Sequence, residues 1–124
     1  MRIELPFPPS ELNPNKRIHR LALIGIKQRY KMQCGLLANL ARKKSVWIPP
    51  TTNGTVPIFI TYVMPDKRKR DRDNLLAASK QALDAVASAL GIDDNQFEPI
   101  TLRREFGKKP GAMIVDILWV VEKI

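Results

Sequence analysis

The sequence predicts an α+β domain in which two helices cover one face of a small mixed β-sheet. Short runs rich in β-branched and aromatic residues indicate strands. Two longer segments repeat their apolar residues at helical spacing. These elements follow the order strand, helix, strand, helix, strand, strand, which is typical of helices packed on one face of a sheet. With 124 residues, we expect a single domain over residues 1–124.

Four segments are expected to form strands. Prolines at positions 6, 8 and 9 end the first of them. A stretch with two prolines, an asparagine and a glycine separates the first helix from the second strand, and a hairpin loop at 107–111 joins the last two. The predicted strands are residues 2–7, 56–64, 100–106 and 112–121.

Two helices are expected, over residues 16–43 and 73–90. Gly25 and Gly35 weaken the first prediction, and a break at either glycine is an alternative. Gly91 is expected to end the second helix in a left-handed conformation. The predicted buried face of the first helix is Ile18, Ala22, Ile26, Leu36, Leu37 and Leu40, and that of the second is Leu75, Ser79, Ala82, Leu83, Val86 and Leu90.

The composition excludes several classes of protein. A hydrophobic content of 44% is too high for a disordered chain. The single cysteine, Cys34, cannot form a disulfide framework or a cysteine-based zinc site, and we expect it to be a packing residue. We see neither the apolar run of a signal peptide nor the roughly 20 apolar residues of a membrane span. A cytoplasmic protein without membrane association is therefore expected.

The net charge of +9 arises from one part of the chain. Nine lysines and arginines and no acids lie between Leu12 and Pro65, whereas the remaining basic and acidic residues balance. Such a field favours phosphate backbones. A well-solvated surface, an acidic membrane and an acidic protein partner are the alternatives. Lys16, Arg20, Lys27 and Lys31 form a narrow arc on the first predicted helix, either a solvated face or a phosphate-facing one.

Chemistry is concentrated in residues 64–74, between a strand and a helix. Five basic residues there surround Asp71 and Asp73. In an extended segment, residues two apart point the same way, so the two carboxylates can aim at one point. Carboxylates together with phosphate ligands are how proteins usually hold Mg²⁺. The alternative is that Asp73 caps the helix, which leaves Asp71 and the basic run unexplained.

A third carboxylate is available after the second helix, in the pair Asp93-Asp94. Taken alone, this pair is typical of a solvated turn. A helix of about 18 residues is roughly 27 Å long, so a loop at its end lies far from its start. Either the chain turns back toward the start of the helix, or a partner subunit supplies the acid.

Two motifs together resemble the RusA family of Holliday-junction resolvases. They are Arg70-Asp71-Arg72-Asp73-Asn74-Leu75 and, after an alanine-rich helix, Gly91-Ile92-Asp93-Asp94-Asn95-Gln96. The opening Leu5-Pro6-Phe7-Pro8-Pro9-Ser10 also resembles that family. The resemblance runs from residue 5 to about residue 116. It implies a RusA-like fold and a homodimer that cuts four-way DNA junctions with Mg²⁺ or Mn²⁺, in DNA recombination and repair. Members are often prophage-borne.

The resemblance also implies roles for individual residues. Asp71, Asp73 and Asp94 would be metal ligands and catalytic residues. The family often has a lysine one turn after the second aspartate, where this chain has Ala77, and Lys80 one turn further along is the candidate replacement or else a surface residue. We expect DNA contacts from the nearby basic residues and one asparagine: Lys16, Arg17, Arg20, Lys27, Lys31, Lys67, Arg68, Lys69, Arg70 and Asn74.

The expected reaction is phosphodiester hydrolysis by water that the metal activates, with arginine or lysine stabilising the charge that develops. Two alternatives remain at this point. One is a DNA-binding protein of the same fold without nuclease activity, toward which Ala77 is the one hint. The other is an RNA-binding protein, which the charge alone would fit. His19, the only histidine, is expected to have a structural or surface role.

Overall fold

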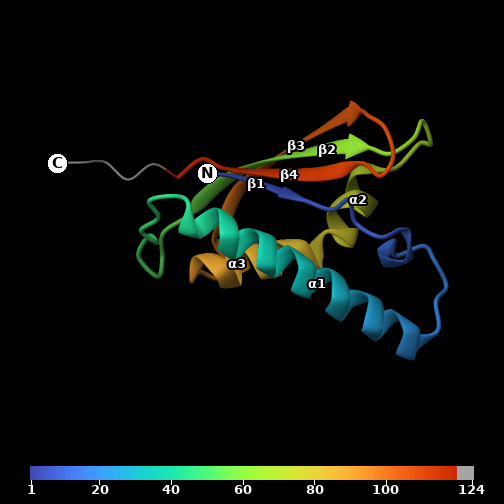
Figure 1. Ribbon diagram of the computed structural model, residues 1–124, viewed down its shortest axis with the longest axis horizontal. Helices are drawn as coiled ribbons and strands as arrows, with labels where there is room; N and C mark the ends of the chain where they lie inside the picture. The colour runs from blue at the N-terminus through green and yellow to red at the C-terminus, as the bar shows by residue number, and fades with distance from the viewer. Residues whose placement is uncertain (120–124) are drawn as a thin grey trace.

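A four-stranded sheet forms one layer of the computed structural model, which describes residues 1–119 (Figure 1). Its strands are β1 (Arg2–Leu5), β2 (Val56–Met64), β3 (Phe97–Phe106) and β4 (Ala112–Ile117), in the order β1-β4-β2-β3. β4 pairs antiparallel with both β1 and β2, whereas β2 and β3 are parallel. The predicted α+β class and mixed sheet are therefore confirmed.

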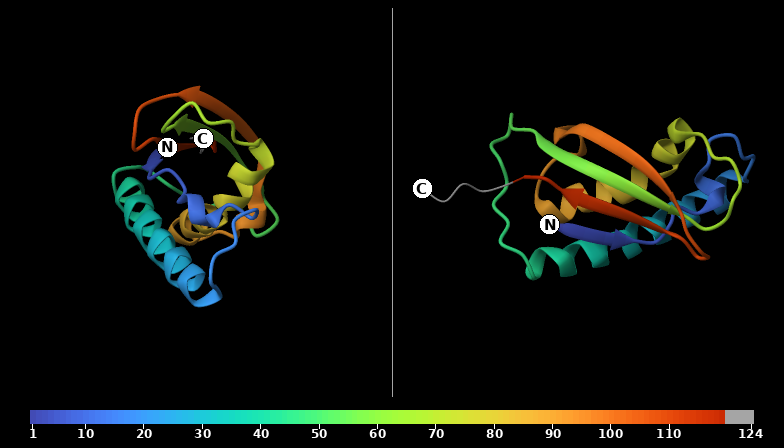
Figure 2. Two further views of the ribbon diagram at one scale, coloured as in Figure 1. Left: turned by 90° about the vertical axis from the view of Figure 1, so that its right-hand side faces the viewer. Right: turned by 90° about the horizontal axis from the view of Figure 1, so that it is seen from above.

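The second layer is helical. α1 (Arg20–Lys43) and α3 (Lys80–Leu90) lie on one side of the sheet, and α2 (Arg72–Ala78) lies at the end where β2 finishes (Figures 1 and 2). Two short 3-10 helices, η1 (Ser10–Leu12) and η2 (Asp94–Gln96), precede α1 and β3. The prediction of one helix over residues 73–90 is wrong, because α2 and α3 are separate helices.

Ser79 marks the break between α2 and α3. Its side chain is fully buried, and its hydroxyl donates to the Leu75 carbonyl at 2.7 Å. The same hydroxyl lies 2.7 Å from the buried Tyr62 hydroxyl of β2. A serine that bonds back to the preceding turn competes with regular helical geometry and bends the helix. The break thus gives a buried tyrosine hydroxyl the partner that it needs.

α1 is a single unbroken helix in spite of its two glycines. It begins at Arg20 rather than at Lys16. The His19 ring accepts a hydrogen bond from the Leu21 backbone at 3.3 Å and caps the helix, which is a structural role. Lys16 and Arg17 therefore precede the helix. The chain continues without a break through both glycines to Lys43.

The predicted buried face of α1 is only partly right, because Ile26 and Leu37 pack against the core but Ala22 is exposed. Tyr30, Cys34 and Ala38 are buried, whereas Leu36 and Leu40 are 63% and 53% exposed. α1 packs against α3, whose buried face is largely alanine. Small residues let two helices approach closely, but they contribute little to a hydrophobicity pattern. The prediction from hydrophobic spacing therefore gave most weight to the leucines and did not identify the face of α1 that contacts α3.

The strand ends also differ from the prediction. β1 stops at Leu5, and β4 at Ile117; residues 120–121 of the predicted last strand lie outside the described part. β3 begins three residues early, at Phe97, directly after η2. The β2–β3 register shifts between Phe97 and Ile100, where Pro99 lacks the N–H that a regular ladder needs.

The core lies between the sheet and the helices. Alternate residues of β1, β2 and β4 point into it, whereas β3 is mostly exposed, and α3 contributes its apolar face. Among the described residues, no helix is both long and apolar enough to cross a membrane. The largest fully buried side chains are Tyr62, Ile3, Ile58, Ile60, Leu90, Met113, Val56, Val86 and Val115.

We predict that Gly35→Ala stabilises the protein. A Cβ at position 35 would lie 4.0 Å from the Ala85 Cβ, which is an ordinary contact. Alanine in a helix interior is favoured over glycine by about 0.5–1 kcal/mol. Urea unfolding would measure the gain. As a control, Gly107→Ala should destabilise, because its Cβ would clash with Val63 and lie 3.0 Å from the Met64 carbonyl. A loss of stability in Gly35→Ala would contradict the α1–α3 contact.

Candidate functional site

Four hollows border the chain around α2, at the end of the sheet where β2 finishes. We name each by one residue that lines it. The Ser10 hollow also contains Lys16, Arg68 and Lys69. The Phe106 hollow contains Arg68, Lys69 and Arg104 together with the acids Asp66, Asp71 and Glu105. The Asp71 hollow contains Asn15, Asp73, Asn74 and Arg104, and the Asp94 hollow contains Asp73, Ala77, Lys80 and Ile100.

Asp71 and Asp73 line the Asp71 hollow together. α2 begins at Arg72, so the residue at the N-cap is Asp71 and not Asp73. The Asp71 backbone is extended, with φ −69° and ψ 140°, and among the described residues its side chain accepts no hydrogen bond from the helix backbone. Capping therefore does not account for this carboxylate. Both side chains are exposed and available to another ligand.

The neighbouring residues Asp93 and Asp94 make different contacts. Asp93 caps η2 by accepting from the Asn95 backbone at 3.1 Å, and Gln96 accepts from the Asp93 backbone at 2.9 Å. The Gln96 amide also donates to the Gly54 carbonyl at 2.9 Å, which attaches this turn to the loop that precedes β2. Asp94 has no part in the cap, and its carboxylate turns toward α3.

Asp94 lies beside the start of α3. Its Oδ2 is 3.9 Å from the Lys80 Nζ, which is also 3.8 Å from Asp84 Oδ2. Lys80 begins and Asp94 follows α3, which has 11 residues and a length of about 16 Å, so this contact requires the chain after α3 to run back along the helix. The chain itself therefore turns back, one of the two routes left open by the sequence.

The three predicted carboxylates are only partly brought together. Asp73 lines both the Asp71 hollow and the Asp94 hollow, so it lies between the other two. Within residues 1–119, no three histidine, cysteine, aspartate or glutamate side chains gather closely enough to hold a metal ion. The arrangement is a row of acids with Asp73 in the middle. Lys80 lines the Asp94 hollow but not the Asp71 hollow.

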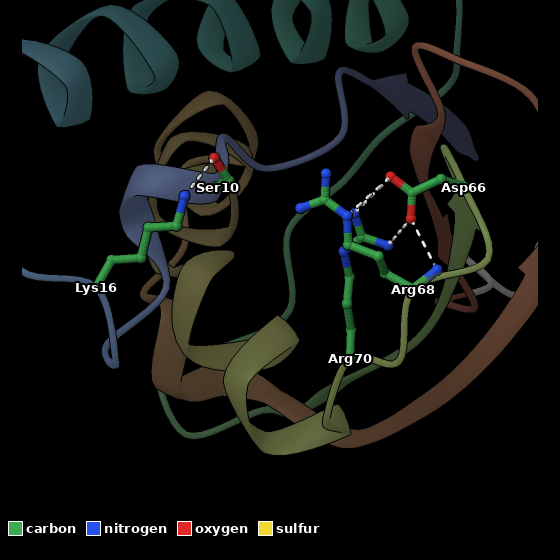
Figure 3. Close-up of polar contacts among 5 residues, drawn as sticks. All are labelled: Ser10, Lys16, Asp66, Arg68 and Arg70. Carbon is green, nitrogen blue, oxygen red and sulfur yellow. Dashed lines mark hydrogen bonds and ion pairs between the residues drawn. The ribbon is translucent and has the colours of Figure 1, made fainter.

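Asp66 was missed in the sequence, although it orders the segment from β2 to α2. Its two oxygens accept from the Arg70 guanidinium at 2.7 and 3.1 Å, and Oδ1 accepts from the Arg68 backbone at 2.9 Å (Figure 3). The hydrogen bonds from Arg70 and Arg68 lower the pKa of Asp66 from 3.8 to about 2. The spacing of four residues between an acid and an arginine was the available signal.

Arg70 is held on its other side by an aromatic ring. Its guanidinium carbon lies 5.4 Å from the centre of the Phe7 ring. Arg104 of β3, also missed in the sequence, donates to the Arg70 carbonyl at 2.8 Å and lines two of the hollows. Arg70 thus has a structural role, whereas its predicted contact with DNA stays a prediction.

The other predicted basic residues are divided between the Ser10 and Phe106 hollows and α1. The Lys16 ammonium donates to the Ser10 hydroxyl at 3.3 Å (Figure 3), and Lys16 lines the same hollow as Arg68 and Arg70. Lys67 lines the Phe106 hollow. Arg17, Arg20, Lys27 and Lys31 are exposed, and the last three lie in the first half of α1, which begins near η1 (Figures 1 and 2).

We predict that the Asp66 carboxyl titrates at about pH 2 in carbon-detected NMR. Arg70→Gln should return its pKa toward 3.8, whereas Lys69→Gln should leave it low. Because the pKa is lowered in the folded state, this pair stabilises the fold above about pH 4 and its contribution disappears as the pH falls through about 2. Wild type and Asp66→Asn should therefore differ in stability at about pH 6 and converge near pH 2. A normal pKa in the wild type would contradict the ion pair.

Comparison with known proteins adds one relative. The chain is 26% identical, over 121 residues, to an uncharacterized protein of Xylella fastidiosa (strain Temecula1 / ATCC 700964). The match covers 98% of this chain and 78% of that protein. No protein-family model matches the chain.

Proposed function

We propose that the protein is a RusA-like, Mg²⁺-dependent endonuclease that cuts four-way DNA junctions. One observation carries the proposal: Asp71 and Asp73 lie together in a hollow that also contains Arg104, and the strongly basic Ser10 hollow and the Phe106 hollow, in which cations outnumber acids, adjoin it. Carboxylates placed among cations suit a reaction in which the substrate brings its own negative charge. The resemblance of the two aspartate motifs to the RusA family supplies the reaction class.

The residues present fit a magnesium ion. Mg²⁺ prefers oxygen ligands, and one or two carboxylates are often enough because water and substrate phosphate complete the octahedron. Asp71 and Asp73 provide two such carboxylates, and Asn74 adds an amide oxygen to the same hollow. Mn²⁺ has similar preferences and is expected to substitute. In this proposal Asp94 acts through Asp73, its neighbour in the adjoining hollow.

Each part of the site has a task in the proposed cleavage. A bound Mg²⁺ supplies Lewis-acid chemistry and lowers the pKa of water. Asp71 and Asp73 would hold the ion, and Arg104 would neutralise charge that develops on the phosphate. Lys16, Arg68 and Lys69 bind neighbouring phosphates and offset the repulsion between DNA and the acids. Lys80 is the candidate for a further cation near Asp94.

The proposed function also implies a homodimer, a cellular role and a location. A four-way junction has two equivalent strands to cut, so a homodimer would place one site on each. The basic surface of α1 would bind a duplex arm of the junction. A role in recombination and repair, a cytoplasmic location and a prophage origin all belong to this proposal and rest on the resemblance.

A second candidate is a DNA-binding protein without nuclease activity. The specific observation in its favour is the ion pairing of Lys80, whose ammonium lies 3.8 Å from Asp84 and 3.9 Å from Asp94. An ammonium in this position compensates Asp94 without any metal ion. Ala77, which faces the same hollow, offers no second cation. Such a protein would bind junctions in the same way and leave them uncut.

We predict that Asp71→Asn binds a four-way junction as tightly as the wild type but does not cut it. The substitution keeps the shape of the side chain and removes the charge that a hard cation requires. Labelled synthetic junctions, incubated with and without Mg²⁺, would show the nicks. Asp116→Asn, at the acid paired with Arg2 on β1, is the matched control and should cut normally. Mg²⁺-dependent cutting by Asp71→Asn would remove this residue from the site. Binding without cutting by the wild type would favour the second candidate.

We predict that reversing the charge of Lys27 and Lys31 weakens junction binding and its salt dependence. Each phosphate contact contributes about 0.9 to the slope of log K against log salt, so two lost contacts should reduce the slope by about 2. Lys43→Glu with Lys44→Glu is the control, because these residues lie at the other end of a helix about 36 Å long. A slope that is the same in both double variants would exclude α1 from the DNA surface.

A further inference from the structure

Phe106 is the one aromatic side chain of residues 1–119 that is fully open to solvent. Its side chain is 86% exposed, whereas every other phenylalanine, tyrosine and tryptophan there is buried or half-buried. It lines a hollow of about 490 Å³ whose other walls include Met64, Arg68 and Arg104. Asp66, Asp71 and Glu105 also line the hollow, but its cations outnumber these acids. The hollow therefore suits a ligand that has both an apolar ring and negative charge.

The position of Phe106 follows from the alternation of β3. Residues two apart on a strand share a face, so Ile100, Arg104 and Phe106 lie in one row. Ile100 lines the Asp94 hollow, Arg104 lines the Asp71 and Phe106 hollows, and the row ends at Phe106. At about 3.3 Å per residue, Phe106 lies about 7 Å along the strand from Arg104. β3 therefore runs beneath the acids and ends at an exposed ring.

The ring is carried by ordered backbone. Phe106 pairs with Met64 as the last residue of the parallel β2–β3 ladder. Directly after it, Gly107 passes so close to β2 that a Cβ would clash with Val63. This close approach fixes the course of the chain on the far side of Phe106. A ring on a fixed strand loses little conformational freedom when a ligand binds to it.

We propose that the Phe106 hollow binds an unpaired nucleobase, stacked on the Phe106 ring, while Arg68 and Arg104 contact its phosphates. This proposal rests on the proposed function and adds a recognition step to it. Bases stack on exposed aromatic rings whatever their identity, and neighbouring cations follow the backbone. A four-way junction pairs its bases, but continuous stacking is interrupted where its strands exchange, so a base can be unpaired there at lower cost. The base would lie next to the phosphate that Arg104 presents to Asp71.

An apolar protein partner fits the hollow less well. To cover the ring, it would also have to cover Arg68, Lys69 and Arg104, which line the same hollow. Burying cations is costly when their remaining donors have no partner, and Arg68 has only a long contact with Asp66 while Arg104 has one hydrogen bond, to the Arg70 carbonyl. A nucleotide avoids this cost, because its base covers the ring and its phosphate pairs with the cations.

The test uses four-way and single-stranded DNA that carry the fluorescent base 2-aminopurine at an unpaired position, with Ca²⁺ in place of Mg²⁺ to prevent cutting. Stacking on the wild-type ring should quench the fluorescence. Phe106→Leu keeps an apolar side chain and should lose the quenching, with about tenfold weaker binding of unpaired DNA and unchanged binding of a blunt duplex. Phe106→Trp should keep both. Leu118→Ala, at another exposed apolar residue, is the control and should behave as the wild type.

The outcomes separate the two proposals. If the wild type binds and cuts junctions while Phe106→Leu quenches and binds as the wild type does, the stacking proposal alone is wrong. Stacking is likewise excluded if light scattering shows that Phe106→Leu converts a dimer to a monomer, because the ring then serves a subunit contact. If the wild type binds no DNA at all, both proposals fail.

Discussion

The Arg70 guanidinium is held between the Asp66 carboxylate and the Phe7 ring, and the whole candidate site is arranged around it. The two-point bond to Asp66 suits the planar fork of arginine and fixes its orientation as well as its distance. Asp66 follows β2 and Arg70 precedes α2, so their pairing sets the course of the intervening chain. The Phe7 ring connects the N-terminal stretch to the Arg70 guanidinium, and Arg104 connects β3 to the Arg70 carbonyl. Three distant parts of the sequence thereby meet at one arginine.

The contacts continue from this guanidinium into the core. The Phe7 ring meets the Tyr62 ring edge-on at 6.3 Å, and the Tyr62 hydroxyl reaches Ser79 at the break between α2 and α3. The buried hydroxyl pair therefore connects the anchoring of the loop with the shape of the helices beside it. A straight helix of about 18 residues would span roughly 27 Å. The break divides this length between α2 and α3, and the chain after α3 runs back so that Asp94 lies 3.9 Å from the ammonium of Lys80, the first residue of α3.

Sequence periodicity predicted β2 to the residue and the apolar face of α3 closely, because both segments are buried along their length. It failed for α1, where the contact with α3 is made by small residues that carry little hydrophobic signal. Asp71 and Asp73 line one hollow, as expected, but the reason given for it was wrong. α2 begins at Arg72, so Asp73 lies in the first turn of a helix and not in an extended segment. The roles of Asp66 and Arg104 were not assigned, since one was counted only as part of a charged run and the other bonds 34 residues away.

The different roles of Arg70 and Arg68 follow from these contacts. Arg70 is only 21% exposed at its side chain and is already paired, so a phosphate would have to compete with Asp66 for it. The Arg68 side chain is 79% exposed, and its contact with Asp66 is a long one at 3.9 Å. Under the proposed function, Arg68 can therefore turn to a phosphate at little cost while Arg70 keeps the segment in place. In this proposal the structural role and the binding role belong to different residues, Arg70 and Arg68, although these lie only two positions apart in the sequence.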